Sequence, residues 1–268
     1  MKNITSVILS LLLFVSCELF EDSTDQKNSN IEYPTIIYPL SETEICKLQL
    51  ELYSLLNSEY LAALDEYGFI RSNWKINRGS SSISDENIAI SQAKATINTF
   101  SQFTNITDTS ILIVKEATNQ SGTPFFSDWI ISFENQSYDN IEVLSTEIMI
   151  IITDNIIQII GHHYPDIVIP DHDLISLEDA EESVIGLELT YYGYADIDTF
   201  VVDENSIHVD NASEETTMKI LPFEVDENIE LRVCWRIPIF MGSIYPDFYI
   251  FIDTVSGDMI TYKTLFIC

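Results

Sequence analysis

The chain contains 268 residues and carries 43 acidic against 12 basic side chains, which gives a formal net charge of −31. Hydrophobic residues make up 46% of the chain and aromatic residues 11%, so a substantial core is expected and disorder of the whole chain is excluded. Nucleic acid is excluded as a partner, because contacts with phosphates require lysine and arginine side chains. The acidity indicates a solvated surface, and it also favours cationic partners.

The N-terminus has the layout of an export signal. Lys2 gives a positive start, the segment from Ile4 to Val15 is largely apolar, and Ser16 precedes Cys17. The apolar run is shorter than the roughly 20 residues that a membrane-spanning helix needs. Residues 1–17 therefore resemble a bacterial lipoprotein signal, in which Cys17 is the site of lipid attachment and becomes the mature N-terminus. An ordinary cleaved signal with an incidental cysteine is the alternative.

A lipid on Cys17 would place the protein in the bacterial cell envelope, as an outer membrane lipoprotein held to the membrane by that lipid. The acidic residues that follow the cysteine, Glu18, Glu21 and Asp22, resemble the surface-export signals of some Gram-negative lipoproteins. Exposure at the cell surface is therefore a further expectation. The sequence leaves the periplasmic and the surface face as alternatives.

Three cysteines remain once Cys17 carries lipid, and an oxidising compartment would allow one disulfide and one free thiol among them. Cys234 lies on a predicted strand and Cys268 ends the last predicted strand, so this pair is favoured over pairings with Cys46. Geometry decides such pairings, and the sequence leaves them open. The cysteine spacing contains no Cys-x-x-Cys motif of the kind that binds metal or undergoes redox exchange.

Residues 18–40 are polar and acidic and contain Pro34 and Pro39, so a flexible tether is predicted there. Ser41 followed by Glu44 is typical of a helix start, because the two side chains can cap each other's backbone N–H groups. Residues 41–82 are predicted to form an N-terminal helix, ended by Gly68, and a linker. The apolar stripe of this helix comprises Ile45, Leu48, Leu52, Leu55, Leu56, Ala63, Leu64 and Tyr67.

Two copies of one plan follow, each a helix and then antiparallel strands. The first begins at Ser84, with a helix whose apolar stripe is Ile88, Ala89, Ala93, Ile97 and Phe100. The second begins at Ser176 and contains the alternating strand 229–239. The predicted fold class is α+β: two tandem modules, each a helix packed on an antiparallel β-meander, preceded by an N-terminal helix.

Short motifs in both copies resemble a known pair of domains. The segment 251–260 resembles the closing hairpin of PepSY domains, and 175–180 resembles the start of the PepSY helix. In the first copy, 138–143 resembles a strand pair of the FTP domain, with Asn140 where glycine is usual. Asparagine tolerates a left-handed backbone, so this replacement is chemically sensible.

The resemblance implies an FTP-like module over residues 83–165 and a PepSY-like module over 166–268. In thermolysin-type metalloprotease precursors, such domains form a propeptide that chaperones or inhibits the protease. The resemblance therefore implies a lipid-anchored extracytoplasmic binding module whose partner is a secreted metalloprotease or another protein. A structural or adhesive surface lipoprotein that binds a glycan or a host protein is the alternative, because a fold does not fix a function.

No familiar catalytic motif is present in the sequence. The four histidines, His162, His163, His172 and His208, do not form the His-Glu-x-x-His motif of zinc proteases, and the eight glycines form no phosphate-binding loop. We therefore predict that the protein is not an enzyme and that it has no catalytic, cofactor-binding or metal-binding residues.

Three clusters carry alternative interpretations. The segment 162–166, with Asp171, His172 and Asp173 nearby, has side chains that bind divalent metals, although connecting loops are often polar for no such reason. The segment 191–194, Tyr-Tyr-Gly-Tyr, could be a contact patch for a partner. The basic residues Arg71, Lys75 and Arg78 could dock an acidic group, although local charge balance in an acidic chain explains them equally well.

Overall fold

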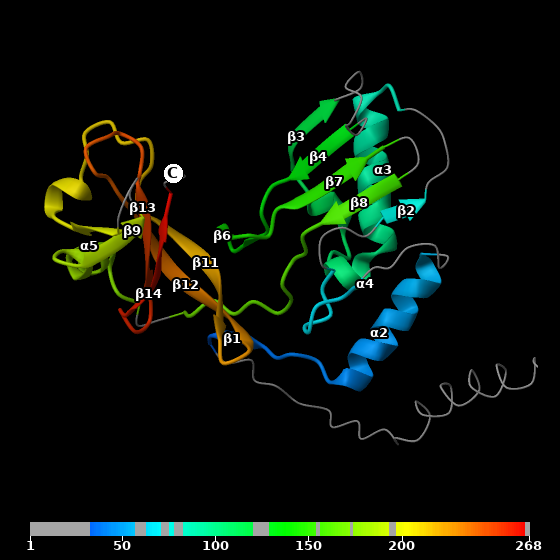
Figure 1. The fold of residues 1–268 in the computed structure, drawn as a ribbon, viewed down its shortest axis with the longest axis horizontal. Coiled ribbons are helices and arrows are strands. Elements are labelled where there is room, and N and C mark those ends of the chain that lie inside the picture. The colour runs from blue at the N-terminus through cyan, green and yellow to red at the C-terminus, as the bar shows by residue number, and fades with distance from the viewer. Residues whose placement is uncertain are drawn as a thin grey trace, which may run out of the picture.

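The computed structural model folds into two lobes, each with its own sheet (Figure 1). The predicted signal with Cys17, the first part of the predicted tether, Cys268, and the side chains of Arg71, Lys75 and Arg78 lie outside what it describes. The described residues are 33–56, 63–70, 75–77, 83–119, 129–153, 156–171, 174–192 and 197–265. No helix among them is long and apolar enough to cross a membrane.

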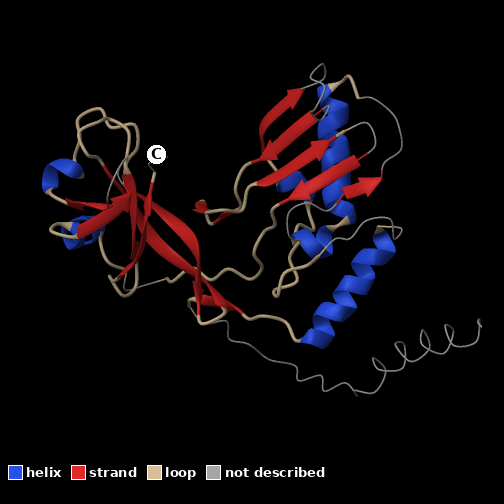
Figure 2. Cartoon of the chain, in the orientation of Figure 1, coloured by secondary structure: helices blue, strands red, loops and turns tan. Residues whose placement is uncertain are grey.

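The first lobe is a five-stranded antiparallel sheet in the order β2-β8-β7-β4-β3, with α3 and α4 on one face and α2 beside them (Figures 1 and 2). A hairpin of two short strands leaves this lobe for the other. The elements of this part of the chain are β1 (Thr35–Ile37), α2 (Glu42–Leu55), β2 (Lys75–Asn77), α3 (Glu86–Thr99), α4 (Ser101–Thr104), η1 (Thr109–Ile111), β3 (Val114–Asn119), β4 (Trp129–Phe133), β5 (Ser137–Tyr138), β6 (Ile141–Val143), β7 (Ile148–Ile152) and β8 (Ile156–Ile160).

The second lobe is a seven-stranded sheet in the order β14-β13-β12-β11-β6-β5, with β1 also paired to β12. A separate ribbon of β9 and β10 and the helix α5 complete it. Its remaining elements are α5 (Leu177–Val184), β9 (Glu188–Tyr192), β10 (Ile197–Val201), η2 (Glu204–Ser206), β11 (Thr217–Val225), β12 (Asn228–Ile239), β13 (Phe248–Asp253) and β14 (Met259–Thr264). Helices packed on antiparallel strands confirm the predicted α+β class.

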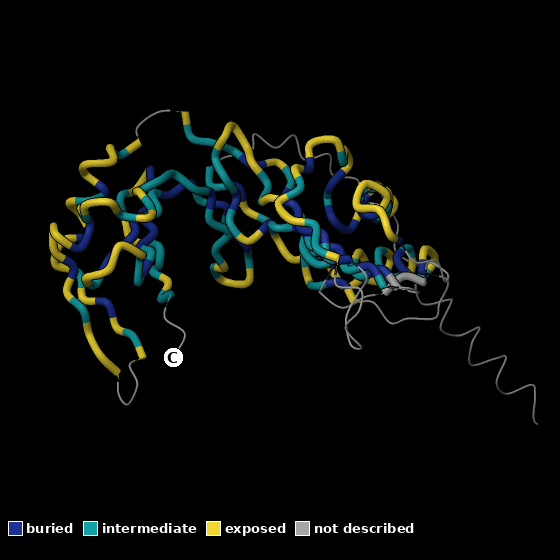
Figure 3. Tube along the Cα trace, turned by 90° about the horizontal axis from the view of Figure 1, so that it is seen from above, coloured by how far each residue is buried: buried dark blue, intermediate teal, exposed yellow. Residues whose placement is uncertain are grey.

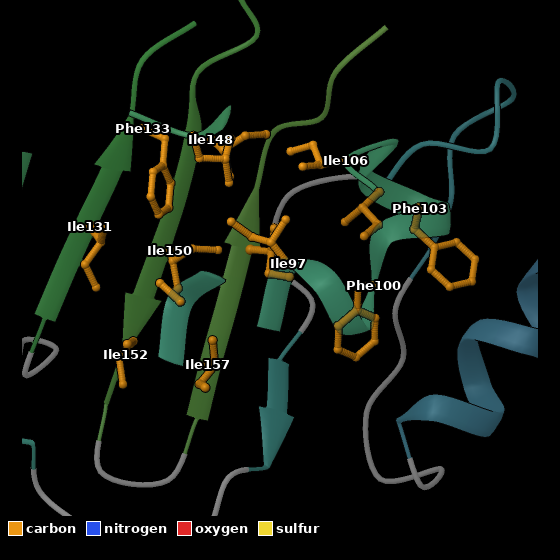
Figure 4. Close-up of a cluster of buried hydrophobic side chains, with 14 of the residues drawn as sticks. Ile97, Phe100, Phe103, Ile106, Ile131, Phe133, Ile148, Ile150, Ile152 and Ile157 are labelled. Atoms are coloured by element: carbon orange, nitrogen blue, oxygen red, sulfur yellow. The ribbon is translucent and has the colours of Figure 1, made fainter. Parts of the chain in front are cut away.

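Each lobe has a core in which a helix packs on one face of the sheet. In β7, Ile148, Ile150 and Ile152 are fully buried, and their neighbours in sequence point to the other face. These side chains belong to one buried cluster with Ile97 and Phe100, and Figure 4 draws the cluster as sticks. Along the chain trace in Figure 3, buried residues lie inside each lobe and exposed residues gather at the turns.

Local capping signals place the helix starts as predicted. Ser41 Oγ accepts from the Glu44 N–H at 3.3 Å, and Glu44 Oε2 accepts from the Ser41 N–H at 2.8 Å. Ser176 caps α5 in a similar way, with its Oγ accepting from the Asp179 N–H at 3.0 Å. α3 starts one residue later than predicted, because Asp85 is its cap.

The predicted continuation of the first helix to Gly68 is wrong, because α2 ends at Leu55. The Asp65 carboxylate accepts from the N–H groups of Tyr67 and Phe69, at 3.0 and 2.8 Å. Such bonds stabilise a turn in place of a helix. Gly68 lies inside this turn with a φ of +83°. In α3, Ile88 of the predicted apolar stripe is 59% exposed, whereas the other members are buried.

The sheets do not divide the chain at residue 165, where the sequence places the module boundary. β5 and β6 come from the first module, but β6 pairs in parallel with β11 of the second sheet. Part of the predicted tether is also structured, because β1 pairs with residues 229–231 of β12. Pairing of backbone groups over long sequence separations overrides the local composition at both places. Loops that join the lobes are visible in Figure 2.

At the junction between the lobes, side-chain amides form hydrogen bonds with backbone groups. Gln136 Nε2 donates to the Tyr164 carbonyl, and Gln136 Oε1 accepts from the Tyr164 N–H, both at 2.9 Å. Asn135 Oδ1 accepts from the Thr146 N–H at 3.0 Å, and Thr146 Oγ1 accepts from the Gln136 N–H at 2.8 Å. We call these four residues the junction network. It satisfies backbone groups that no strand pairs at this position.

Replacement of Gln136 by alanine is expected to lower the free energy of unfolding by about 2 kcal/mol, because both backbone groups of Tyr164 lose their partner in a half-buried place. Urea unfolding measures this. Gln102→Ala is the matched control, since Gln102 is exposed and its side-chain amide donates to the exposed end of another side chain, the Glu51 carboxylate, at 2.7 Å. Its cost should stay below about 0.5 kcal/mol. Equal unfolding midpoints for the two variants would contradict the role of the junction network.

Candidate functional site

A groove of about 320 Å³ opens beside the junction network. Its walls are the connection from α4 through η1 to β3 and the connection from β4 to β5, and His163 also lines it. We call it the junction groove. Two segments that are distant in sequence therefore meet at one concave surface. This surface lies where the chain leaves the first sheet after β4 and joins the second sheet as β5.

The rim of the junction groove carries large apolar side chains that are exposed to solvent. Ile111 is 63% exposed, Ile113 is 61% exposed and Tyr138 is 41% exposed. Leu112, between the two isoleucines, is buried in the first core and holds the segment in place. Lys94 fixes the same segment from α3, because its Nζ donates to the Leu112 carbonyl at 2.9 Å. The exposed apolar groups therefore stand on a rigid support.

Two carboxylates lie among these apolar groups. Asp108 caps η1, with Oδ1 accepting from the Ser110 N–H at 2.8 Å. Hydrogen bonding to Ser110 lowers the pKa of Asp108, so this carboxylate is charged at neutral pH. Glu134 is held beside Ile113 by a bond from its own N–H to the Ile113 carbonyl at 2.9 Å. In the described part of the chain, no hydrogen bond or ion pair involves the carboxylate of Glu134. The groove is therefore negative as well as apolar.

A second hollow adjoins the groove and shares Glu134, Asn135 and Ser137 with it. Its charges are paired within the protein. Lys115 Nζ lies 2.7 Å from Glu147 Oε2, and Lys219 Nζ lies 2.6 Å from Glu142 Oε2. The acid without a partner, Glu134, is thus the one that faces both hollows.

The two histidines of the segment 162–166, for which metal binding is the alternative interpretation, have different surroundings. His162 stacks on Phe69, with ring centroids 3.9 Å apart and planes 8° apart, and meets the edge of Tyr164. His163 is only 5% exposed, and its backbone N–H donates to the Thr104 carbonyl at 2.9 Å. The Nε2 atoms of both rings are buried without a hydrogen-bond partner among the described residues.

Burial lowers the pKa of His162 to about 4, with repulsion from His163 as a second cause, and burial lowers the pKa of His163 to about 4 as well. Both rings are therefore neutral at physiological pH. His172 and Asp173 lie outside the described residues, and among those described no three metal-binding side chains gather. His208 lies in the second lobe, 3.8 Å from Glu181.

The second sheet carries a charged face whose basic groups are engaged. Arg232 lies 2.6 Å from Glu230 and 2.8 Å from Asp253, and Arg236 lies 2.9 Å from Glu214. These residues alternate along β12 and its neighbours with apolar residues that face the core, as the sequence predicts. Each arginine has its own acid, so this face offers little charge for a partner.

Cys234 lies on the same face, fully buried. It is a free thiol whose Sγ lies 3.5 Å from the Lys219 carbonyl, and Cys268, the partner that the sequence favours for it, lies outside the described residues. Burial raises the pKa of this thiol, which keeps it protonated and unreactive. Cys46 is an exposed free thiol on α2.

The predicted tyrosine patch is partly described. Tyr192 is 77% exposed on the outer face of the β9–β10 ribbon, where Ile197 lies opposite it. Tyr191 points to the inner face and meets Phe248, with ring centroids 5.7 Å apart. Gly193 and Tyr194 lie outside the described residues.

Sequence reasoning did not single out the junction groove. Ile111 and Ile113 belong to a run that predicts a strand from Ser110, and such a run does not tell which side chains stay exposed. The tract from 134 to 138 offers a weak signal, because Glu-Asn-Gln-Ser directly after a buried strand indicates a polar crossing. Tyr138 entered only through the FTP-like motif.

Comparison with known proteins adds little to this geometry. No protein-family model matches the chain, and no curated protein matches it. Among solved structures, the Bacillus megaterium YpeB C-terminal domain is similar over 85% of this chain and 99% of that chain. The identity is 14% and the TM-score is 0.32, so this likeness supports no functional argument.

The free energy of unfolding is expected to decrease as the pH is lowered from 7.5 to 5. In the unfolded chain an imidazole gains its proton near pH 6.5, whereas the folded protein resists protonation until about pH 4. The unfolded state thus binds more protons in this window, and each imidazole costs about 1.4 kcal/mol per pH unit below 6.5. Urea unfolding at several pH values measures the slope.

His162→Phe keeps the ring stack on Phe69 and removes one titrating group, so it should roughly halve that slope. His208→Gln, which replaces an exposed histidine of the second lobe, is the control for the loss of an imidazole. A stability that is flat from pH 7.5 to 5 in the native protein would show that the two rings titrate normally.

Proposed function

We propose that this protein is a lipid-anchored extracytoplasmic binding module that captures a partner protein in the junction groove. The observation that carries the proposal is the gathering of Ile111, Ile113 and Tyr138, all exposed, around one concave site. On a surface of net charge −31, apolar side chains are costly to leave in water unless they contact something. A partner that covers them gains the free energy of their burial.

The rigidity of the groove supports the same proposal. Its two walls are held by Lys94 on one side and by the junction network on the other. A preformed surface needs little ordering when it binds, so more of the contact energy appears as affinity. In this role the groove binds a partner and carries out no chemical step, and it needs no cofactor or metal.

The partner class follows from the FTP-like and PepSY-like motifs. They suggest a secreted metalloprotease that is inhibited or chaperoned by the anchored protein. The signal-like residues 1–17 and the acids that follow Cys17 suggest an outer membrane location with exposure at the cell surface. A second candidate is an adhesive lipoprotein that binds a glycan or a host protein. The exposed ring of Tyr192 favours this candidate, because aromatic rings on an open ribbon are suitable contacts for either ligand.

Anchoring is tested by Cys17→Ala in the full chain. The native protein should incorporate labelled palmitate and sediment with membranes, because the thiol is the attachment point for lipid. The variant should lose both properties and appear in the soluble fraction. A chain with Cys46→Ala is the control and should stay membrane-bound. Palmitate incorporation that survives in the Cys17 variant would contradict the lipoprotein assignment.

Use of the groove is tested by Ile111→Ser combined with Ile113→Ser. Each change removes apolar contact worth about 1 kcal/mol, so inhibition of co-secreted metalloproteases should weaken about thirtyfold. The matched control is Ile88→Ser, since Ile88 is 59% exposed and lies on α3, away from the groove. The control should inhibit as the native protein does.

Two results would contradict parts of this proposal. If none of the metalloproteases is inhibited at high micromolar protein, the partner class is wrong. If capture of a partner is unchanged in the groove variant but lost in Tyr192→Ser, the adhesive candidate is correct and the ribbon is its contact surface.

A further inference from the structure

We infer that the junction groove accepts an extended polypeptide segment with alternating apolar and basic side chains, which adds a strand at the open edge of β5. This inference rests on the proposed function, because it names the class of partner that the same groove would take. Three independent features support it: the open edge of β5, the charge of the groove and the spacing of its apolar rim.

The terminal strand of the second sheet, β5, lines the junction groove, and the terminal strand of the first sheet, β3, begins directly after the lining residue Ile113. β3 ends the order of the first sheet and β5 ends the order of the second, so each pairs on one side only among the described strands. In Figure 1, β3 lies on the side of its sheet that faces the other lobe, and β6 lies between the two lobes. Unpaired edges are templates for a further strand.

The edge of β3 is protected, whereas that of β5 is not. β3 has a register shift between Val114 and Glu116, which places Lys115 in a bulge, and both features oppose strand addition. In β5, the Gln136 carbonyl accepts from the Val143 N–H at 2.8 Å, so its neighbour Ser137 directs its backbone groups to the open side. Ser137 also lines the groove.

The charge of the groove selects basic side chains. The Asp108 and Glu134 carboxylates are exposed there, and Lys94, the base near Asp108, already donates to the Leu112 carbonyl. A lysine or arginine side chain that enters would pair with these acids. It would also find His163 along the wall.

The apolar rim matches an extended chain. Ile111 and Ile113 stand two residues apart on one wall, with Tyr138 on the other. In an extended segment, side chains alternate in direction, so apolar residues would meet this rim while the residues between them turn toward the acids. A helix would present a different spacing, with neighbours three and four residues apart.

The test uses the full-length protein in mild detergent and three synthetic peptides of about eight residues. The first alternates lysine and valine, the second has glutamate in place of lysine, and the third is the first with N-methyl groups along one edge. Fluorescence anisotropy measures affinity. We expect the first peptide to bind, the second not to bind, and the third to bind about tenfold more weakly.

Substitutions locate the binding. Glu134→Gln and Asp108→Asn should each weaken the lysine peptide about threefold, and asparagine keeps the cap of η1. Glu188→Gln is the control, because Glu188 is an exposed acid on β9. Added salt should weaken binding in the native protein. On addition of peptide, the imidazole resonance of His163 should shift and that of His208 should not.

Equal affinity for the lysine and glutamate peptides, or unchanged affinity in both acid variants, would overturn the charge argument and the inference with it. Equal affinity for the N-methylated peptide would overturn strand addition. If no peptide binds but the isoleucine double variant still loses its native partner, the inference fails and the proposed function stands. If that double variant keeps its native partner, the proposed function fails on its own test.

Discussion

The structure depends on how the chain crosses between its two sheets without leaving backbone groups unpaired. After β4 the chain leaves the first sheet, forms β5 and β6 at the edge of the second, and returns to form β7. At the crossing, Gln136 bonds both backbone groups of Tyr164. A side-chain amide has one donor and one acceptor side, so it replaces the strand that is missing there. A third core cluster, with Phe69, Val143 and Leu231 among its members, buries apolar surface at the same place.

Because the chain crosses between the sheets in this way, the two lobes are joined by several contacts and not by one linker. β1 pairs with β12, and the chain then passes to α2, which packs on the first core. Thr35 joins the same region to the segment after β8, because its Oγ1 donates to the Asp166 carbonyl at 3.1 Å and accepts from the Val168 N–H at 2.9 Å. Several connections in parallel restrict relative motion far more than a single linker does. The junction groove inherits its fixed walls from them.

Sequence reasoning predicted what local physics decides. The Ser41–Glu44 cap and the left-handed Asn140, with a φ of 65°, are set by neighbours within a few residues. It failed where pairing partners lie far apart in sequence, as for β1 and for the parallel pair of β6 and β11. The groove was missed for the same reason. Ile111 and Ile131 are the same residue type, yet the first is exposed and the second is buried, and only tertiary packing separates them.

The scarcity of basic residues gives the groove its chemical character. Four of the basic residues each pair with an acid of the same chain: Lys115, Lys219, Arg232 and Arg236. The acid paired with Arg232 is Asp253, whose Oδ1 accepts from the N–H groups of Val255 and Ser256 in the closing hairpin. Bases used in this way are not available to neutralise the remaining acids. Among the described residues, the Glu134 carboxylate has no hydrogen-bond or ion-pair partner, at a site where apolar side chains are also exposed. A surface that is both negative and apolar is complementary to a cationic, partly apolar chain, and that complementarity needs no further element of the fold.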